Sequence, residues 1–418
     1  MNILVLNCGS SSLKFQIIDT DSQAMINDSD RCLVKGEVDR IGSQSLIQYE
    51  VPGLPIIKKT DPIPNYRSAI EMVLSWVISD KSGIKQINSY ADIDAAGHRV
   101  VHGGEHFSKS IYIDQQVIEG IEDCVELAPL HNPANIKGIK TVTRILGPQL
   151  PQVGVFDTAF HSTMPEQAYL YGLPYEFYRR YKIRRYGFHG TSHRFIAYQY
   201  RNMTGLEKQQ TNIISLHLGN GCSACAIKAG ISIDTSMGFT PLEGLLMGTR
   251  SGDVDASILE YLHLKEGMTF NELDTMLNKR SGLLGISGLT SDMRELLEEE
   301  FEKQDRRAKL AIEIFCRRIA RYIGKYFVEM NGELDAIVFT GGIGENSVTI
   351  RTRVCVQLQC LGIALDEMQN KIMVNDHKGK ITSESSKIHA YVIPTNEELM
   401  IARDTLKVIK KHQDKLGQ

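Results

Sequence analysis

The order of hydrophobic and polar positions predicts strands that alternate with helices. Two short apolar stretches, 3–6 and 13–18, flank a turn of glycine and serines, and Lys14 and Gln16 alternate with apolar residues in the second stretch. A period of two is typical of a strand. Residues 65–78 instead carry apolar side chains at helical spacing. Regular exchange between the two patterns indicates an α/β protein.

Later segments continue this exchange. Further strands are predicted at 32–41, 45–51, 93–104 and 335–340, and further helices at 131–146, 256–264, 306–330 and from 348 onwards. In the helix at 131–146 we expect Asn132 as the N-cap and Pro133 at the first helical position. A last strand and helix close the chain, with the helix capped near Thr395 or Asn396. The acidic tract 296–303 is interpreted as a solvated helix face.

One segment repeats the layout of the first 18 residues. Residues 212–227, NIISLHLGNGCSACAI, contain an apolar strand, a turn with asparagine and glycine, a serine and a second apolar strand. The two copies lie too far apart in the chain for a solenoid, so the sequence indicates duplicated domains.

Three glycine-rich turns follow apolar strands: NCGSSS at 7–12, LGNGCS at 218–223 and TGGIGENS at 340–347. Glycine lets the backbone approach a ligand closely, and successive backbone N–H groups in such turns form a site for an anion. Serine hydroxyls and Lys14 add donors. A single Asn-Gly turn is usually an ordinary hairpin, but several such turns in one chain favour phosphate binding.

Other phosphate and acyl-transfer motifs do not match. The P-loop sequence G-x-x-x-x-G-K-[ST] is absent. GNGCSA fits the Rossmann motif only loosely, because strand sequence follows where a helix is needed. Ser11 and Lys14 have the spacing of the first motif of penicillin-binding enzymes, but the partner motifs of that class are missing.

Composition excludes further classes. The 418 residues carry a formal net charge of -3, whereas a nucleic-acid-binding protein usually has a basic domain. No apolar stretch is long enough to span a bilayer, and the first residues lack the basic start of a secretory signal. The cysteines are scattered and form no zinc-binding set. We therefore expect a cytoplasmic protein of two or three domains with reduced thiols.

A few arginine, histidine and acidic residues lie in sequence positions that are typical of binding or catalytic sites. Arg99 and Arg250 lie beside glycines, and a guanidinium binds carboxylate or phosphate as a fork, although a lone arginine more often forms a structural salt bridge. His189 has a position from which an imidazole can donate to a migrating phosphoryl group. Asp157 ends a strand, and Glu397 opens the last helix, where a carboxylate can also simply complement the helix dipole.

A set of motifs in chain order resembles the acetate kinase family: NCGSSSLK, HRVVHGG, LAPLHNP, VFDTAFH, RYGFHGTSH, HLGNG, GTRSGD, FTGGIGENS and TNEE. The resemblance runs from residue 2 to beyond residue 400. It implies the superfamily of acetate and sugar kinases, heat-shock chaperones and actin, with two duplicated actin-like ATPase domains of ribonuclease H-like fold and a nucleotide cleft between them. One domain would be 1–156, completed by the helix 396–418; the other, 157–395, would carry nucleotide and dimer contacts.

The resemblance also implies roles for single residues. Asp157, His189, Arg250 and Arg99 would be catalytic; His189 and Arg250 would stabilise the transition state, and Arg99 would also bind the substrate. The metal would be held by Asn7 and Glu397. The methyl group of the substrate would be bound by Val101, Leu130, Phe188 and Pro241. The nucleotide would be bound by Lys14, His217, Leu218, Gly219, Asn220, Gly221, Gly341, Gly342, Ile343, Gly344, Glu345 and Asn346.

The implied function is reversible phosphoryl transfer from ATP to acetate, giving ADP and acetyl phosphate by direct in-line attack. Mg²⁺, or Mn²⁺ in its place, would assist. We expect ATP and a short-chain carboxylate as ligands, a homodimer, and no nucleic acid or membrane as partner. Propionate or butyrate could be the acid instead, and pyrophosphate the donor. An actin-like assembly protein or chaperone ATPase is the alternative from another class, but it would leave Arg99 and Arg250 unexplained.

Overall fold

The computed structural model describes residues 1–9 and 11–416, and Ser10 of the first glycine-rich turn lies outside this part of the chain. The described residues form two units, each built on one mixed β-sheet. The first unit consists of residues 1–159 and the C-terminal helix, and the second unit consists of residues 160–395.

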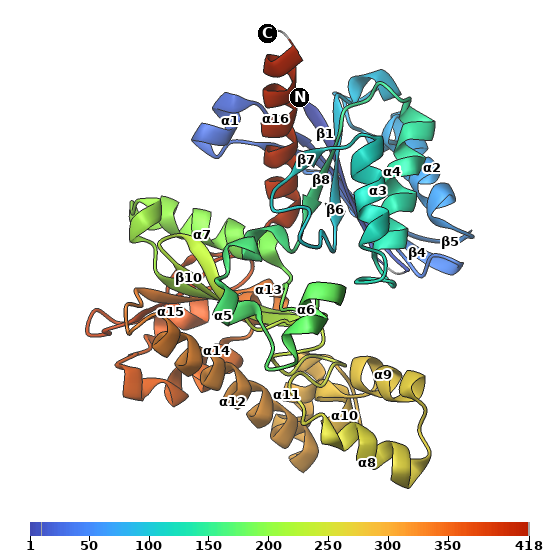
Figure 1. The fold of residues 1–418 in the computed structure, drawn as a ribbon. Helices are drawn as coiled ribbons and strands as arrows, with labels where there is room; N and C mark the ends of the chain where they lie inside the picture. The colour runs from blue at the N-terminus through green and yellow to red at the C-terminus, as the bar shows by residue number, and fades with distance from the viewer. Residues whose placement is uncertain (10, 417–418) are drawn as a thin grey trace. The chain divides into compact units, whose positions relative to one another are not determined.

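The sheet of the first unit is formed by β1 (Asn2–Cys8), β2 (Leu13–Asp19), β3 (Arg31–Asp39), β4 (Ser43–Glu50), β5 (Ile57–Ile63), β6 (Ala95–Val100), β7 (Ile111–Tyr112) and β8 (Gln152–Phe156). The strand order is β5-β4-β3-β2-β1-β6-β8-β7 (Figure 1). β1 is antiparallel to β2 and parallel to β6, and β6 is parallel to β8. The carboxyl ends of β1, β6 and β8 therefore lie at one edge of the sheet.

Helices cover both faces of this sheet: α1 (Ser22–Asn27), α2 (Tyr66–Val77), α3 (Gln115–Asp123), α4 (Asn132–Leu146) and α16 (Glu397–Leu416). Side chains of β1 alternate between two cores. Leu4 and Leu6 join the core that includes α2, whereas Ile3 and Val5 join the core of α16. A strand buried on both faces needs apolar residues throughout, which explains the continuous apolar run of β1.

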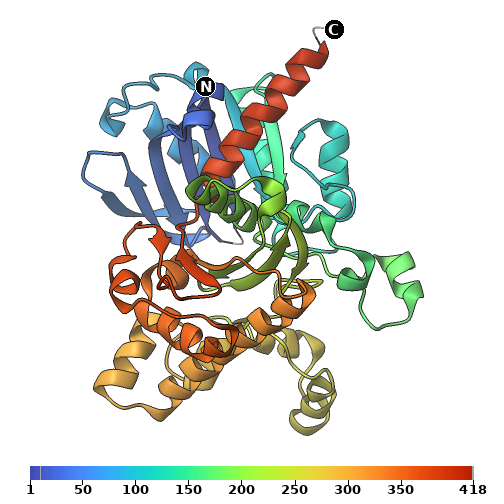
Figure 2. The same ribbon diagram turned by 90° about the vertical axis from the view of Figure 1, so that its left-hand side faces the viewer.

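The C-terminal helix is an integral part of the first unit. Figure 2 shows α16 lying across the sheet, where it contacts β1, β6 and β8. Gly97 of β6 permits this close approach, because a Cβ there would lie 2.7 Å from Cγ2 of Ile401. The chain thus returns to the first unit after the whole second unit has been formed.

The sheet of the second unit is formed by β9 (Ile213–Leu218), β10 (Cys222–Lys228), β11 (Ile231–Thr235), β12 (Ala336–Thr340), β13 (Gly379–Lys380) and β14 (His389–Val392). Its strand order is β11-β10-β9-β12-β14-β13. β9 is antiparallel to β10 and parallel to β12, and β12 is parallel to β14. This order and these directions match those of β3-β2-β1-β6-β8-β7, so the repeat seen in the sequence is a repeat of sheet topology.

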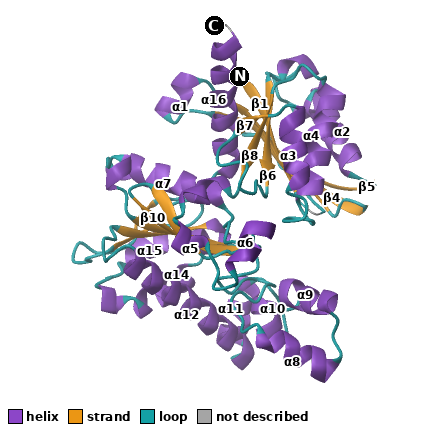
Figure 3. Cartoon of the chain, in the orientation of Figure 1, coloured by secondary structure: helices purple, strands orange, loops and turns teal. Residues whose placement is uncertain are grey.

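Helices of the second unit are α5 (Glu166–Tyr169), α6 (Tyr175–Tyr181), α7 (Gly190–Thr204), α8 (Ser257–Glu266), α9 (Phe270–Lys279), α10 (Gly282–Ser287), α11 (Met293–Glu302), α12 (Arg306–Glu329), α13 (Gly341–Asn346), α14 (Val348–Gln357) and α15 (Glu367–Ile372). α7 and α12 lie on opposite sides of the sheet (Figure 1). The segment from α8 to α12 is helical and occupies the connection between β11 and β12 (Figure 3).

Short 3₁₀ turns complete the described structure: η1 (Asp80–Ser82), η2 (Tyr90–Asp92), η3 (Ala159–Thr163), η4 (Lys208–Gln210) and η5 (Gln359–Leu361). None of the helices in the described part of the chain combines the length and the apolar character needed to cross a membrane.

Some local predictions were wrong. His131, not Asn132, occupies the N-cap position of α4, and its side chain makes no capping hydrogen bond. The side chain of Asn132 instead bonds the backbone of His102 through both its oxygen and its nitrogen. TGGIGENS is not a turn: after Gly341 at φ 74° the backbone forms the short helix α13. Within the acidic tract Glu300 is buried and pairs with Arg353 at 2.8 Å, so that face of α11 is not wholly solvated.

Candidate active site

In the first unit, Arg99 and Asp157 are brought together by neighbouring parallel strands. Arg99 lies near the end of β6, and Asp157 follows β8 directly. The guanidinium donates as a fork: Nε bonds Oδ1 of Asp157 at 2.9 Å and Nη2 bonds Oδ2. Asp157 is fully buried. The carboxylate thus fixes the plane of the guanidinium, as bidentate pairs do.

The first glycine-rich turn supplies Asn7 to the same cluster. Nη1 of Arg99 donates to Oδ1 of Asn7 at 3.0 Å. Lys14 is the strand partner of Asn7 across the hairpin, and its ammonium lies 3.8 Å from the carboxylate of Glu37, with both side chains about half exposed. An exposed pair of this length contributes little stability, so Lys14 is held only weakly and can reach another anion.

Glu397 completes this cluster from the first turn of α16. Its carboxylate lies 3.9 Å from Nε of Arg99. Burial raises the pKa of Glu397 to about 7, Arg99 opposes the rise, and the neighbouring Asp157 adds to it. Asp157 and Glu397 together bring more negative charge than Arg99 neutralises, and this excess is a suitable setting for a cation.

The residues predicted to bind the methyl group lie in different environments. Val101 is 6% exposed, and its backbone N–H donates to Oδ1 of Asn135 at 3.1 Å. Phe188 is buried, and its carbonyl accepts a hydrogen bond from His161. Leu130, in contrast, is 65% exposed. In the free chain Leu130 is therefore a surface residue.

In the second unit, His189 precedes α7 with a left-handed backbone, at φ 55°. Non-glycine residues take this conformation only in a few per cent of cases, in turns and helix caps as well as at functional sites. Nδ1 of His189 lies 2.9 Å from Oγ of Ser223, and its ring lies against His217 with centroids 4.2 Å apart. The ring is thus held on one edge and one face.

Arg250 and His189 both border Gly221. Among the described residues no carboxylate pairs with Arg250; Nη1 donates to the carbonyl of Pro241 at 3.1 Å and contacts Sδ of Met247. Burial lowers its pKa. A Cβ at Gly221 would lie 3.6 Å from both Nη1 of Arg250 and Cε1 of His189, so this glycine leaves space where the two cationic or polar groups converge. Such a space fits an anion.

The turn between β9 and β10 is fixed by the loop that carries Arg250. The N–H of Gly248 donates to the carbonyl of Asn220 at 2.9 Å, and a side chain at Gly248 would overlap Oδ1 of Asn220. The structure therefore joins Asn220, Gly221, His189, His217 and Arg250, which the sequence placed in separate motifs.

A pocket of about 970 Å³ adjoins this turn within the second unit. It is lined by Gly219, Asn220, Ser291, Asp292, Met293, Arg294, Leu297, Gly342, Ile343, Asn346, Ser347, Val348, Thr349 and Asn375. Pockets of this size bind ligands the size of a nucleoside. Of these residues, sequence reasoning had named Gly219, Asn220, Gly342, Ile343 and Asn346 and missed the others, among them residues 291–294 and 297. The only local signal there is Asp292 as N-cap of α11, which is common to many helices.

Glu345 fixes the backbone next to this pocket. Its carboxylate accepts hydrogen bonds from the N–H groups of Gly341 at 2.7 Å and Thr395 at 3.1 Å. Burial raises its pKa. Glu345 and Gly344 do not line the pocket, and neither does His217 or Leu218; they shape the backbone around it.

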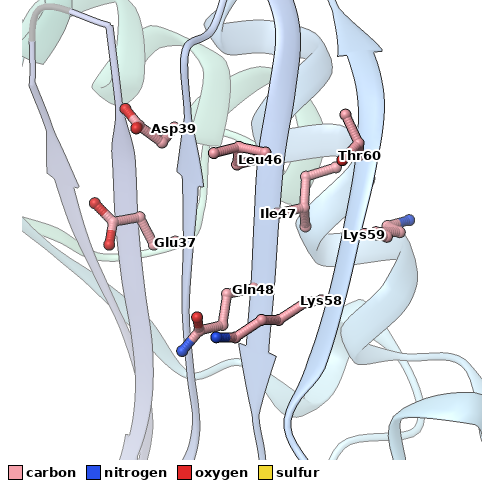
Figure 4. A pocket seen from close by; sticks show the side chains of 8 residues that line it. All are labelled: Glu37, Asp39, Leu46, Ile47, Gln48, Lys58, Lys59 and Thr60. Carbon is pink, nitrogen blue, oxygen red and sulfur yellow. The ribbon is translucent and has the colours of Figure 1, made fainter.

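A further hollow, of about 410 Å³, lies on the outer strands of the first sheet (Figure 4). Glu37 and Asp39 of β3 line one side, and Lys58 and Lys59 of β5 lie across β4 from them. Charges of both signs are mixed here, and Glu37, the ion-pair partner of Lys14, is the one lining residue that contacts a predicted site residue in the described part of the chain. We therefore do not assign the active site to it.

Comparisons with known proteins support a single family. The chain matches the sequence model of the acetokinase family over residues 2–403. It is 54% identical over 418 residues to an acetate kinase of Chloroherpeton thalassium, covering 99% of this chain and 100% of the relative. It is also 54% identical over 409 residues to an acetate kinase of Solibacter usitatus, covering 98% of both chains.

Solved structures agree. The crystal structure of Porphyromonas gingivalis acetate kinase aligns with a TM-score of 0.90 at 44% identity, covering 98% of this chain and 99% of that chain. A propionate kinase from Francisella tularensis aligns with a TM-score of 0.87 at 45% identity, covering 96% of this chain and 98% of that chain. The two repeated sheets thus have the actin-like ATPase fold. The chain belongs to the acetokinase family.

Proposed function

We propose that the chain is an acetate kinase, which transfers the γ-phosphoryl group of ATP reversibly to acetate. The observation that carries this proposal is Arg250. In a member of the acetokinase family, this partly buried guanidinium lacks a carboxylate partner among the described residues and borders, with His189, the space left by Gly221. A cation in such a position costs free energy unless an anion binds it, and a phosphoryl group is an anion of the required kind.

The proposed reaction is a direct in-line displacement. An oxygen of the acetate carboxylate forms a bond to the γ-phosphorus while the bond from that phosphorus to the β–γ bridging oxygen breaks. The bond's electron pair leaves with ADP. Acetate is already ionised at neutral pH, so no general base is required. Catalysis then consists of positioning and of neutralising charge, which we assign to His189, Arg250 and Arg99, with Asp157 orienting Arg99.

We assign the metal to Asn7 and Glu397. Mg²⁺ prefers oxygen ligands and commonly takes one or two carboxylates together with phosphate oxygens and water. The oxygen of Asn7 and the carboxylate of Glu397 meet this preference. Burial, and to a lesser extent the charge of Asp157, raises the pKa of Glu397, and a bound cation would favour its ionised form. When bound, Mg²⁺, or Mn²⁺, supplies charge neutralisation for the phosphates.

We place the adenosine in the pocket beside Gly342, Ile343 and Asn346, with the phosphates toward the turn 218–221, His217 and Lys14. The volume of about 970 Å³ favours ATP over pyrophosphate as the donor, because pyrophosphate would leave most of it empty. Leu218, Gly341, Gly344 and Glu345 would hold the backbone of this site.

Acetate is the proposed acid, with Val101, Leu130, Phe188 and Pro241 contacting its methyl group. The likeness to a propionate kinase supports propionate as the second candidate. One methylene in an apolar pocket changes binding by only about 1–3 kcal/mol, so activity on propionate is expected beside that on acetate. We further propose, from the family resemblance, a homodimer in the cytoplasm.

The test traps acyl phosphate with hydroxylamine while ATP consumption is measured. We expect acyl hydroxamate with ATP, Mg²⁺ and acetate, less with propionate, and none when the acid is omitted. Comparing kcat/KM for acetate, propionate and butyrate identifies the acid. Steady hydrolysis of ATP without hydroxamate would contradict the proposal and favour a nucleotide-switch protein.

A further inference from the structure

A chain of hydrogen bonds runs from His189 into the core of the second unit. Oγ of Ser223 lies 2.9 Å from Nδ1 of His189 and 2.8 Å from Nε2 of His193. Nδ1 of His193 in turn lies 3.0 Å from Oγ of Ser215. Ser215, His193 and Ser223 are fully buried, so water does not compete for these bonds.

The single hydrogen of the Ser223 hydroxyl links the two rings. It can be donated to only one of the two nitrogens, and the other nitrogen must then carry a hydrogen of its own and donate to the oxygen. His193 is neutral in this environment, because burial and the nearby rings of His161 and His217 hold its pKa well below the ordinary value. A neutral His193 carries one hydrogen on its ring. The direction of the Ser215 hydrogen bond therefore determines, through His193 and Ser223, which ring nitrogen of His189 carries the hydrogen.

Ser215 determines in which direction the linked hydrogen bonds are donated. Within the described part of the protein, its hydroxyl oxygen has His193 as its side-chain hydrogen-bond partner and no acceptor besides it. If Nδ1 of His193 carried the hydrogen, the hydroxyl hydrogen of Ser215 would be buried without an acceptor, which is unfavourable. The satisfied arrangement has Ser215 donating to Nδ1 of His193, Nε2 of His193 donating to Ser223, and Ser223 donating to Nδ1 of His189.

We infer that Ser215, His193 and Ser223 are positioning residues that hold His189 in the tautomer with its hydrogen on Nε2. Whether one imidazole nitrogen carries a hydrogen is determined by the hydrogen bond that the other nitrogen makes. The Nε2 edge borders the space beside Gly221, since a Cβ there would lie 3.7 Å from Nε2 and 3.6 Å from Nη1 of Arg250. The inference rests on the proposed function in one respect: this N–H donates to the migrating phosphoryl group, where the other tautomer would present a repelling lone pair.

The test is ¹⁵N NMR of the full chain labelled at histidine, because protonated and unprotonated ring nitrogens have widely separated shifts. The His189 and His193 signals are assigned by their loss in His189→Asn and His193→Asn. In the wild type we expect a hydrogen on Nε2 and none on Nδ1 in both rings. In Ser223→Ala, the Nδ1 signal of His189 should move toward the average of two exchanging tautomers, and Ser223→Thr, which keeps a hydroxyl, should restore it.

Ser236→Ala is the matched control. Ser236 is equally buried, and its hydroxyl accepts from the N–H of Ala224, the residue after Ser223, but it takes no part in the chain to His189. This variant should leave the His189 signals unchanged. Acetate-dependent kcat should fall in Ser223→Ala, by less than the about 10²–10³-fold that loss of the donor itself costs, with KM for both substrates nearly constant, and recover in Ser223→Thr.

Either of two results would overturn the inference: a hydrogen on Nδ1 of His189 in the wild type, or identical His189 signals in wild type and Ser223→Ala. The NMR measurement needs no turnover. A wild-type chain with the expected tautomers but no acyl phosphate formation would therefore refute the proposed function and leave the hydrogen-bond chain intact.

Discussion

At the scale of single residues, arginines that look alike in the sequence have different surroundings. Arg99 is bound by the carboxylate of Asp157. Arg351 is fully buried and donates to carbonyl and amide oxygens of the backbone and of Asn370. No carboxylate in the described part of the chain pairs with Arg250, and its Nη1 donates to the carbonyl of Pro241. A charge left unneutralised in a partly buried place is costly, so Arg250 is best explained by a bound anion.

Arg250→Ala should lower kcat by about 10²–10³-fold, the usual cost of losing one donor to a developing charge. Thermal stability should stay close to wild type, because the guanidinium forms no salt bridge with a described carboxylate. Steady-state kinetics and a melting curve measure the two effects. Arg250→Lys keeps the positive charge but loses the forked guanidinium, so its kcat should lie between those of the wild type and Arg250→Ala. A large drop in melting temperature in Arg250→Ala would indicate a structural role instead.

Glu397→Gln should raise stability at pH 8 and not at pH 5, in metal-free buffer. Folding raises the pKa of Glu397 from 4.5 to about 7. Between these values the folded chain binds more protons than the unfolded chain, so the stability of the wild type falls as pH rises through this window and stays lower above it. Glutamine removes this penalty, about 1–3 kcal/mol at pH 8.

Urea unfolding at the two pH values measures this difference, and acetate kinase activity should be lost in the same variant. Equal stability gains at pH 5 and pH 8 would contradict the assignment of the effect to ionisation of Glu397.

At the scale of elements, short helix α13 depends on a residue of the next helix. Nη1 of Arg351 in α14 donates to the carbonyls of Gly344 at 2.9 Å and Glu345 at 2.7 Å, and Nη2 donates to those of Asn370 and Met373. Burial lowers the pKa of Arg351 to about 10. These bonds satisfy carbonyls at the end of α13 that would otherwise lack donors.

Arg351→Met should therefore destabilise the second unit by about 3 kcal/mol or more, since several buried carbonyls lose their donor. A fall in melting temperature of about 6–12 °C is expected. KM for ATP should rise more than KM for acetate, because α13 lines the pocket in which we place the adenosine. The exposed Arg67→Met, which removes only an i,i+4 pair with Glu71, is the control and should change stability by about 0.5 kcal/mol or less.

Most elements could be predicted from local pattern, and the misses have local causes. The helix predicted at 65–78 is α2, which the structure shows to be capped by Asn65, and the paired strands on either side of LGNGCS are β9 and β10. The short β7 and β13, of two residues each, carry too few positions to show a period. Asn132 was wrongly taken as a cap because its contact with His102, 30 residues away, leaves no local trace.

At the scale of the whole molecule, chain order and spatial order differ at the C-terminus. α16 covers the face of the first sheet formed by Ile3, Val5, Val153 and Val155. Those side chains would be exposed to water without it. The first unit therefore cannot be completed until the chain beyond the second unit has been made.

A chain ending at Asn396 should fail to fold its first unit, while residues 160–395 keep their own core. Limited proteolysis should then cut within residues 1–159 and spare the second unit. A chain ending at Lys411, which lacks only the end of α16, should resist proteolysis like the wild type because Gln413, Asp414 and Lys415 are exposed and add nothing to the core. Equal resistance of the shorter chain would show that α16 is not needed.

The sequence by itself determined the alternation of strands and helices, the repeated hairpins and the motifs of the family, because hydrophobic period and turn chemistry are properties of neighbouring residues. Only the tertiary structure decided the electrostatic state of the functional groups. Arg99 meets Asp157 across 58 residues, and His189 meets Ser223 across 34. Burial and partners brought from such distances fix which arginine is neutralised, raise the pKa of Glu397 and underlie the tautomer that we infer for His189, and none of these follows from local pattern.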